Sequence, residues 1–124
     1  YQGFQGKANY HFTAVEELLP LEMYECDDRV ELPSGAHPKI VSNHPIVSGI
    51  DDEWPILLGY NKVKAKGEVI VEIEDDPLLI ADNFGKGKVA SYTSDFAPHW
   101  APPEFIEWPH YRDIWVNLLR WLAE

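Results

Sequence analysis

The 124-residue chain has the usual size of a single domain, and its 45% hydrophobic and 13% aromatic residues are enough to build an ordered core. Its 21 acidic residues outnumber its 10 basic ones, and a surface with a formal net charge of −11 repels nucleic-acid phosphates and anionic lipid. Composition therefore argues against nucleic acid and membrane as partners, and apolar runs of only about five residues argue against a transmembrane helix, which needs about twenty.

The chain contains one cysteine, Cys26, which has no partner for an internal disulfide. No secretory signal pattern occurs at its start. We therefore expect a reduced, soluble, cytoplasmic protein. The chain does not begin with methionine, which leaves open that a leader or a whole first half has been removed.

The first helix is predicted at residues 13–19. It begins with Thr13-x-x-Glu16, a capping-box pattern in which a hydroxyl and a carboxylate satisfy free backbone amides, and it ends at Pro20. Short extended segments are expected after it, at residues 21–25, 29–32 and 38–42. A Pro-Ser-Gly turn at residues 33–35 should separate the second of these from the third.

Residues 67–93 show the clearest strand pattern. In GEVIVEIE apolar residues alternate with glutamates, with one violation at Ile70, and this pattern predicts a half-buried strand. Turns at Asp75-Asp76-Pro77 and Gly85-Lys86-Gly87 should connect it to LLIADNF and then to KVASYT. The three segments together predict an antiparallel β-meander.

A C-terminal helix is predicted from Pro109, whose missing amide costs nothing in a first helical turn. Apolar residues follow at helical spacing on one face: Tyr111, Ile114, Trp115, Leu118, Leu119 and Leu122. This stripe predicts a helix packed on the sheet. With only two predicted helices, one sheet face would be bare, so either the sheet is small or the chain is the second part of a larger α/β domain.

Several segments together resemble the C-terminal half of glutamine-amidotransferase-like proteins, which are uncharacterised bacterial members of the class I glutamine amidotransferase-like superfamily. The segments are GKANYHFTAVEELLPL, DDRVELPSG, HPIVSGI, WPILLGYNKV, DPLLIADNFGKGKVASYTSDFAPHW and PPEFIEWPHYRDIWVNLLRWLAE. The resemblance implies a flavodoxin-like α/β sandwich in which residues 1–124 form the C-terminal part of one domain. Its first strands and helices would lie in a missing N-terminal half, and homo-oligomerisation is a further family-level expectation.

The opening residues YQGFQG are similar to the nucleophile elbow of class I amidotransferases, G-x-C-x-G-x-Q, whose glycines permit a strained turn. On this pattern Tyr1 takes the cysteine position, Gly3 the elbow glycine and Gln5 the glutamine. A phenol with a pKa of about 10 is a poor acyl-transfer nucleophile at neutral pH. The resemblance therefore implies that glutaminase activity is absent, and it places Gly3 within reach of the loop around His99.

The family's second signature, a His-x-Glu pair after a late strand, does not occur at the matching position. KVASYT is a strand of the right kind, but SDFAPHW follows it. His99 and Glu104 lie five residues apart across two prolines, so the family's base and orienting carboxylate are not carried over.

The loop at residues 94–105 is the remaining candidate site, because open α/β sheets commonly bind ligands where a strand ends. The candidate ligand-binding residues are Tyr1, Gly3, Gln5, Ser94, Asp95, His99, Trp100 and Glu104, and the catalytic candidates are Tyr1, Asp95 and His99. A second interpretation is structural. In it Trp100, Phe105 and Trp108 pack the entry to the last helix while Asp95 caps a turn.

The remaining reactive side chains give weaker signals. Cys26 precedes two aspartates that disfavour a reactive thiolate, so it is interpreted as a structural or incidental thiol and not as a relocated nucleophile. The five histidines lack metal-ligand spacing, so a metal site could form only from residues distant in sequence, and no cofactor is predicted. His37 and His44 precede prolines and are expected to brace turns.

These observations predict a ligand-binding or assembly module that lacks glutaminase activity, with an unidentified small molecule as its ligand. A hydrolase-type enzyme is the alternative, with Asp95 and His99 as acid or base and Tyr1 as a hydrogen-bond donor. A third interpretation is an obligate structural subunit that requires the missing half.

Overall fold

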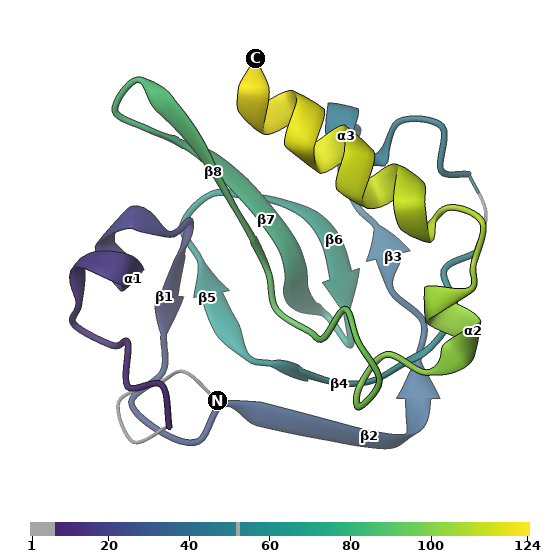
Figure 1. The fold of residues 1–124 in the computed structure, drawn as a ribbon. Coiled ribbons are helices and arrows are strands. Elements are labelled where there is room, and N and C mark those ends of the chain that lie inside the picture. Colours follow the sequence, from purple (N-terminus) through teal and green to yellow (C-terminus); the bar gives the residue numbers. More distant parts are fainter. Residues whose placement is uncertain (1–6, 52) are drawn as a thin grey trace.

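The computed structural model describes residues 7–51 and 53–124 (Figure 1). Its elements in chain order are α1 (Ala14–Leu18), β1 (Leu21–Met23), β2 (Arg29–Ala36), β3 (Lys39–Ile40), the 3-10 helix η1 (Pro45–Val47), β4 (Leu57–Asn61), β5 (Val63–Ala65), β6 (Glu68–Ile73), β7 (Asp76–Phe84), β8 (Gly87–Tyr92), α2 (Pro103–Ile106) and α3 (Tyr111–Ala123). The predicted α/β class, with an antiparallel meander and a C-terminal helix, is confirmed.

The central sheet has the strand order β3-β6-β7-β8, and every neighbouring pair is antiparallel. The predicted turn between β6 and β7 is displaced. Ile73 pairs with Asp76, so the turn consists of Glu74 and Asp75, whose φ angles are 50° and 63°. Two central residues with positive φ are typical of the type I′ turn, whose twist matches that of the strands it joins. Pro77 therefore lies within β7.

The violation of alternation at Ile70 coincides with an irregularity in the sheet. The register between β6 and β7 shifts between Val69 and Val71, as in a β-bulge, and Ile70 and Val71 are both fully buried. The bulge places consecutive apolar residues in the core, which a regular strand would direct to opposite faces.

Residues 33–35 do not form the predicted reversing turn. They belong to β2, which pairs with β4 in a two-stranded ribbon whose register is irregular between Glu31 and Ala36. Gly35 has a φ of 71°, and a Cβ there would lie 2.7 Å from the Ile56 side chain. Left-handed backbone at this glycine lets the strand kink and continue.

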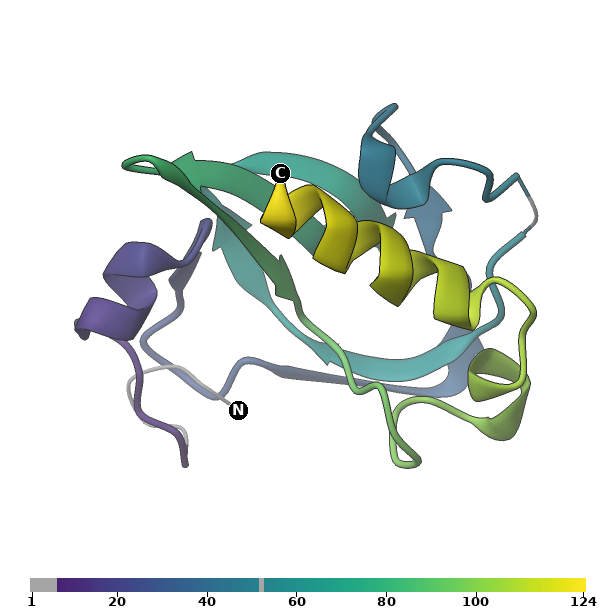
Figure 2. The same ribbon diagram turned by 45° about the horizontal axis from the view of Figure 1, so that its top comes forward.

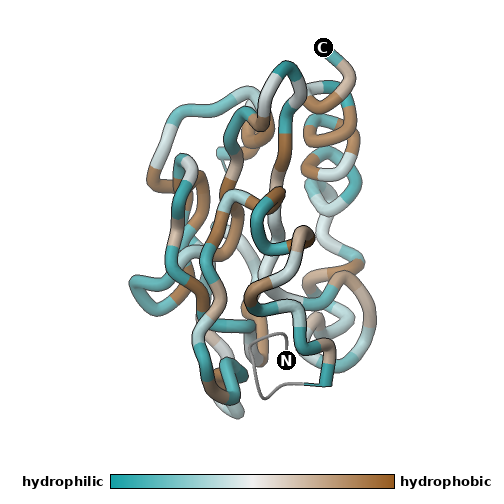
Figure 3. Tube along the Cα trace, turned by 90° about the vertical axis from the view of Figure 1, so that its left-hand side faces the viewer, coloured by the Kyte–Doolittle hydropathy of each residue, from teal (hydrophilic) through white to brown (hydrophobic). Residues whose placement is uncertain are grey.

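Helix α3 lies across one face of the central sheet (Figure 2). The opposite face is not entirely bare, because the β1–β5 ribbon packs on part of it at β7. Buried Leu21, Met23 and Val63 from this ribbon pack against Ile80 of β7. Hydrophobic and hydrophilic segments alternate along the strands and α3 in Figure 3, as expected for elements with one buried side.

Helix α1 forms where it was predicted, but the capping box does not. The Thr13 hydroxyl donates to the carbonyl of Tyr10 (2.5 Å), and Glu16 accepts from the amide of Phe12 (3.0 Å). The other Glu16 oxygen accepts from the amide of Met23 in β1 (2.6 Å). The carboxylate is therefore buried, where it links the helix to the adjacent ribbon.

Helix α3 begins at Tyr111, two residues after Pro109, and its inward side differs slightly from the prediction. Ile114 is buried and Trp121 packs against the core, whereas Leu119 and Leu122 are 66% and 38% exposed. No helix in the described part of the chain is long and apolar enough to cross a bilayer.

Candidate functional site

The loop after β8 is attached to β4 at both of its ends. The amide of Asn61 donates to the carbonyl of Thr93 (2.7 Å), and the amide of Leu58 donates to the carbonyl of Trp100 (2.8 Å). Backbone hydrogen bonds to a strand hold a loop in one conformation. Residues 94–99 therefore project from a fixed base.

Asp95 and His99, both predicted as site residues, are in direct contact. One carboxylate oxygen of Asp95 lies 2.7 Å from Nδ1 of His99 and also accepts the backbone amide of Trp100 (3.3 Å). The His99 side chain is 66% exposed, and no described residue hydrogen bonds to its Nε2. Asp95 thus caps the turn and orients the imidazole at the same time.

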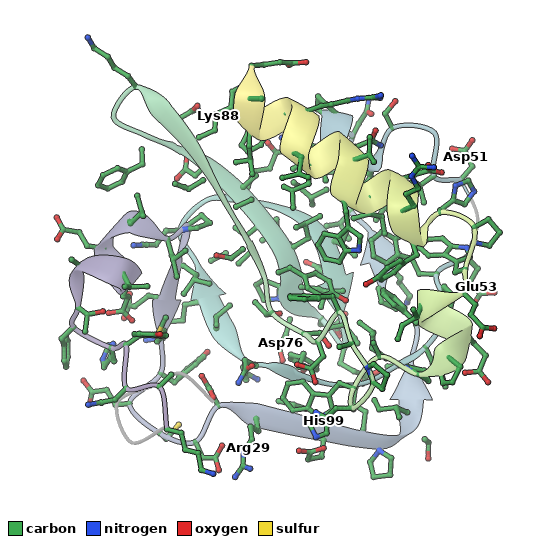
Figure 4. The ribbon with its side chains drawn as sticks, in the orientation of Figure 1. Arg29, Asp51, Glu53, Asp76, Lys88 and His99 are labelled. Carbon is green, nitrogen blue, oxygen red and sulfur yellow. The ribbon has the colours of Figure 1, made fainter. Side chains whose placement is uncertain are left out.

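Trp100 packs against the imidazole of this pair. Its side chain is almost fully buried, its ring stacks on His99 with centroids 5.2 Å apart, and its Nε1 donates to a carboxylate oxygen of Glu31 in β2 (3.0 Å). The indole crosses β4 at Gly59, where a Cβ would come within 2.4 Å of Nε1. Figure 4 shows His99 beside β2 at the lower rim of the molecule.

Gly59 and Glu31 were not predicted as part of the site. The only local signal was a glycine inside the strand-like segment WPILLGYNKV, which is typical of close backbone approach but does not identify what approaches. The partner, Trp100, is distant in sequence. Pairing of β2 with β4 is needed to bring Glu31 beside it.

The other predicted site residues have different positions. The Ser94 hydroxyl donates to the carbonyl of Gly59 (2.7 Å), which makes it part of the loop's attachment to β4. Glu104 is exposed on α2, and no hydrogen bond among the described residues joins it to Asp95 or His99. Tyr1, Gly3 and Gln5 lie outside the described residues, so the elbow and its proximity to His99 stay predictions.

The aromatic residues after the loop pack the core, as the structural interpretation predicted. Phe105 is fully buried and Trp108 nearly so, and both pack against Trp54, with the Trp54 and Trp108 rings 5.3 Å apart. These side chains fix the connection from α2 to α3. The structural interpretation therefore holds for Phe105 and Trp108 and for the turn cap at Asp95, while a ligand-binding role for Asp95 and His99 stays a prediction.

A second polar cluster, not predicted, lies beside α1. Nδ1 of His11 lies 2.9 and 2.8 Å from the two carboxylate oxygens of Glu16, and its Nε2 lies 3.5 Å from Glu25. The hydrogen bond to Glu16 raises the pKa of His11. Burial would raise the pKa of Glu16, but hydrogen bonds from the Phe12 and Met23 amides and from His11 bring that pKa below its ordinary value.

The remaining candidates have structural roles or no partner group. His44 accepts the amide of Ile46 at the start of η1 and braces that turn, as predicted. Nδ1 of His37 lies 2.6 Å from the carbonyl of Trp54 and so connects two segments that are distant in sequence. Cys26 is a free, exposed thiol. Among residues 7–51 and 53–124, no three His, Cys, Asp or Glu side chains gather in an arrangement that could hold a metal ion.

Comparison with known families supports the resemblance seen in the sequence. The sequence model of a family described as "Putative glutamine amidotransferase" matches residues 1–124. No curated protein matches the chain.

Two solved structures share the fold closely. Cytoplasmic Protein STM1381 from Salmonella typhimurium LT2 is 44% identical with a TM-score of 0.92, and the match covers 98% of this chain and 51% of that one. Cytoplasmic Protein STM3548 from Salmonella typhimurium is 42% identical with a TM-score of 0.92, covering 98% and 50%. The predicted cytoplasmic location agrees with both names. The chain spans about half the length of these solved relatives.

Proposed function

Because this chain belongs to the "Putative glutamine amidotransferase" family, we propose that it is a ligand-binding module of that fold without glutaminase activity. The ligand is a small molecule held at the loop that carries Asp95 and His99. The observation that carries the proposal is the 2.7 Å contact between these two side chains on a loop fixed to β4. This contact orients the exposed imidazole of His99, and an imidazole is a common polar anchor for small ligands.

The lack of glutaminase activity rests on the residues at the nucleophile position. Aligned on the family's elbow, the chain has Tyr1 where an acyl-transfer enzyme needs a thiol, and its single cysteine is Cys26. We expect no release of ammonia or glutamate from L-glutamine above the buffer rate. Hydrolysis that is lost in Cys26→Ser would overturn this part of the proposal.

The finer description of the fold is also a proposal. In it residues 1–124 are the C-terminal part of a flavodoxin-like α/β sandwich that is completed by an N-terminal half and that can assemble further into homo-oligomers. The 51% and 50% coverage of the two Salmonella chains supports the view that the family's domain is about twice this length.

Ligand binding is tested by nuclear magnetic resonance. Signals from the His99 ring and the Trp100 indole are followed while L-glutamine, L-glutamate and a library of small polar fragments are added. We expect saturable shifts at these two residues, and a loss of affinity of at least tenfold in His99→Gln. The matched control is His110→Gln, because His110 also lies beside an aspartate, Asp113 (2.9 Å), and this variant should bind normally.

Two results would contradict the ligand proposal. One is that no compound shifts His99 or Trp100. The other is that His99→Gln and His110→Gln bind equally well, which would place the ligand elsewhere.

A second candidate function is an acid–base enzyme, and the same contact favours it. A carboxylate on Nδ1 fixes the imidazole tautomer and leaves Nε2 to take or donate a proton, as in catalytic His–Asp pairs. In this alternative Tyr1 donates a hydrogen bond at the former nucleophile position. Reproducible turnover in a broad hydrolase screen that His99→Ala abolishes would establish the enzyme and displace the pure binding role.

A further inference from the structure

Strand β8 forms an open edge of the central sheet. It follows β7 as the last strand in the order, and no described segment pairs with its other side. The amide of Thr93 donates to the carbonyl of Leu78, which marks that pair as hydrogen-bonded. Antiparallel pairs alternate, so the backbone groups of Lys88, Ala90 and Tyr92 face away from β7.

This edge lacks the features that usually protect an exposed strand. It is six residues long, it contains no proline, and Lys88 is its only charged residue. The ammonium group of Lys88 donates to the carbonyl of Trp121 on α3. This charge is therefore directed toward the helix and does not block the edge. Natural proteins block free edges with charges, prolines or covering segments, because an open edge readily pairs with another strand.

The adjacent flank of α3 is also uncovered and apolar. Trp115 contacts Tyr92 of β8 and Phe96, which places this side of the helix next to the open edge. Leu119 and Leu122 follow Trp115 by one and two helical turns on the same flank, and they are 66% and 38% exposed.

The opposite flank of α3 is occupied. There Asn117 donates to the carbonyls of Ile46 and Ser48 in and after η1. The helix is therefore packed on the η1 side, whereas on its other flank Leu119 and Leu122 are exposed beyond the contact of Trp115 with β8. Phe96, at 67% exposure, extends the bare apolar surface beyond the end of β8.

We propose that the surface formed by β8, Phe96, Leu119 and Leu122, which we call the β8–α3 edge, is the docking site for a polypeptide partner. The partner adds an extended strand to β8 and lays an apolar element on the bare flank of α3. Main-chain hydrogen bonds would supply affinity and the leucine and phenylalanine contacts would supply specificity.

The partner is the part of the family's chain that this chain does not span. Both Salmonella structures match almost all of this chain with a TM-score of 0.92, yet about half of each lies outside the match. A half of that size needs a surface on which to pack. A strand added to the sheet edge and a helix laid on the exposed flank of α3 would extend both layers of the α/β fold. The inference rests on the second half of the fold proposed above, and it does not depend on ligand binding at His99.

The test uses the unmatched half of STM1381, co-expressed with this chain as a separate polypeptide. We expect a one-to-one complex. In amide hydrogen exchange, Lys88, Ala90 and Tyr92 should exchange rapidly in the isolated chain and become protected by at least tenfold in the complex. Val89 and Ser91 should be protected in both, because their amides face β7.

Two variants probe the two parts of the surface. Ala90→Pro removes an outward-facing amide without removing a bond to β7, and Leu119→Lys places a charge on the bare flank. Each should weaken the complex by at least tenfold. Leu18→Lys on α1 is the matched control, since Leu18 is also an exposed helical leucine (43%) and should bind within twofold of the unmodified chain.

Several outcomes would overturn the proposal. They are the absence of a complex, unchanged exchange at the three outward amides, and equal binding by Leu119→Lys and Leu18→Lys. Protection of the three amides in the isolated chain that rises with its concentration would instead assign the edge to a second copy of this chain. None of these results involves a small molecule, so they leave the His99 proposal to its own experiment.

Discussion

Gly59 allows the Trp100 indole to lie directly on the backbone of β4. A Cβ at this position would approach Nε1 to 2.4 Å, and the indole also stacks on the His99 ring. We therefore expect Gly59→Ala to lower the free energy of unfolding by about 1–3 kcal/mol, as overpacking of a filled site does. Urea denaturation followed by tryptophan fluorescence measures the change.

Gly87→Ala is the matched control for Gly59→Ala. Gly87 also lies in a strand, but a Cβ there would meet only the carbonyl of Phe84 at 3.6 Å. This variant should change the unfolding free energy by less than about 0.5 kcal/mol. Equal destabilisation by both variants would show that strand propensity, and not the Trp100 contact, determines the requirement for glycine.

The His11–Glu16 pair predicts a pH dependence of stability with a definite sign. The pKa of His11 is raised above 6.5 in the folded state, so its stabilising contribution is complete below pH 6.5 and is lost as the pH rises through the folded pKa. The charged groups around the ring are Glu16 and Glu25, and Lys66 binds the backbone carbonyl of Glu16. The stability difference between the unmodified chain and His11→Gln should therefore shrink from pH 6 to pH 9.

His44 provides a control of opposite sign. Burial lowers its pKa, so its neutral form is favoured in the folded chain and stability is lost as the pH falls below 6.5. The stability of the unmodified chain relative to His44→Gln should therefore rise with pH in the same series of urea titrations. A His11→Gln difference that also grows with pH would contradict the assigned ion pair.

At the scale of elements, the β6–β7 turn holds two non-glycine residues at positive φ, where a Cβ is unfavourable. Asp75 has a φ of 63° in a type I′ turn, a position that glycine occupies without steric cost. Asp75→Gly and Asp75→Ala both remove the carboxylate and differ in their tolerance of positive φ. We expect the glycine variant to be more stable than the alanine variant by about 1 kcal/mol in thermal or urea unfolding.

The neighbouring hairpin supplies the negative control. In the β7–β8 turn Gly85 has the positive φ, of 60°, while Lys86 does not. Lys86→Gly should therefore gain nothing over Lys86→Ala and should be less stable by up to about 1 kcal/mol, because glycine gives the unfolded chain more freedom. A gain for glycine at both positions would argue against the turn type assigned to Glu74 and Asp75.

The sequence predicted those elements whose evidence is local. The β6–β8 meander, α1 and α3 follow from alternation, helical spacing and turn residues within a few positions of one another. The β1–β5 and β2–β4 ribbons were missed as pairings, because pairing partners that are distant in sequence leave no periodic signal in either strand. The sequence therefore contained no sign that β1 and β5 pack on the sheet at Ile80.

The candidate site also contains one contact that is local in sequence and others that are not. Asp95 and His99 are four residues apart in one loop, and their contact was within reach of sequence reasoning. The support beneath them joins Glu31, Gly59 and Trp100 from three separate segments. Only the fold brings these residues together, so no local pattern could have assigned Glu31 or Gly59 to the site.

At the scale of the whole molecule, the net charge of −11 opposes the compact state. Salt screens this repulsion, with a Debye length of about 10 Å at 0.1 M. We expect the melting temperature to rise by about 3 °C between 20 and 300 mM NaCl in a calorimetric scan. Glu107→Lys, which reduces the negative charge, should show a smaller rise, and a fall in melting temperature with salt would indicate that specific ion pairs outweigh the general repulsion.

The pairing of β1 with β5 has a consequence for the order of events during synthesis. Leu21 pairs with Ala65, roughly forty residues later, so a ribosome that adds about 5–20 residues per second delivers the partner strand only after several seconds. During that interval Leu21 and Met23, both buried in the finished structure, have no sheet on which to pack. The β1–β5 ribbon is therefore a part of the nascent chain that we expect chaperones to contact.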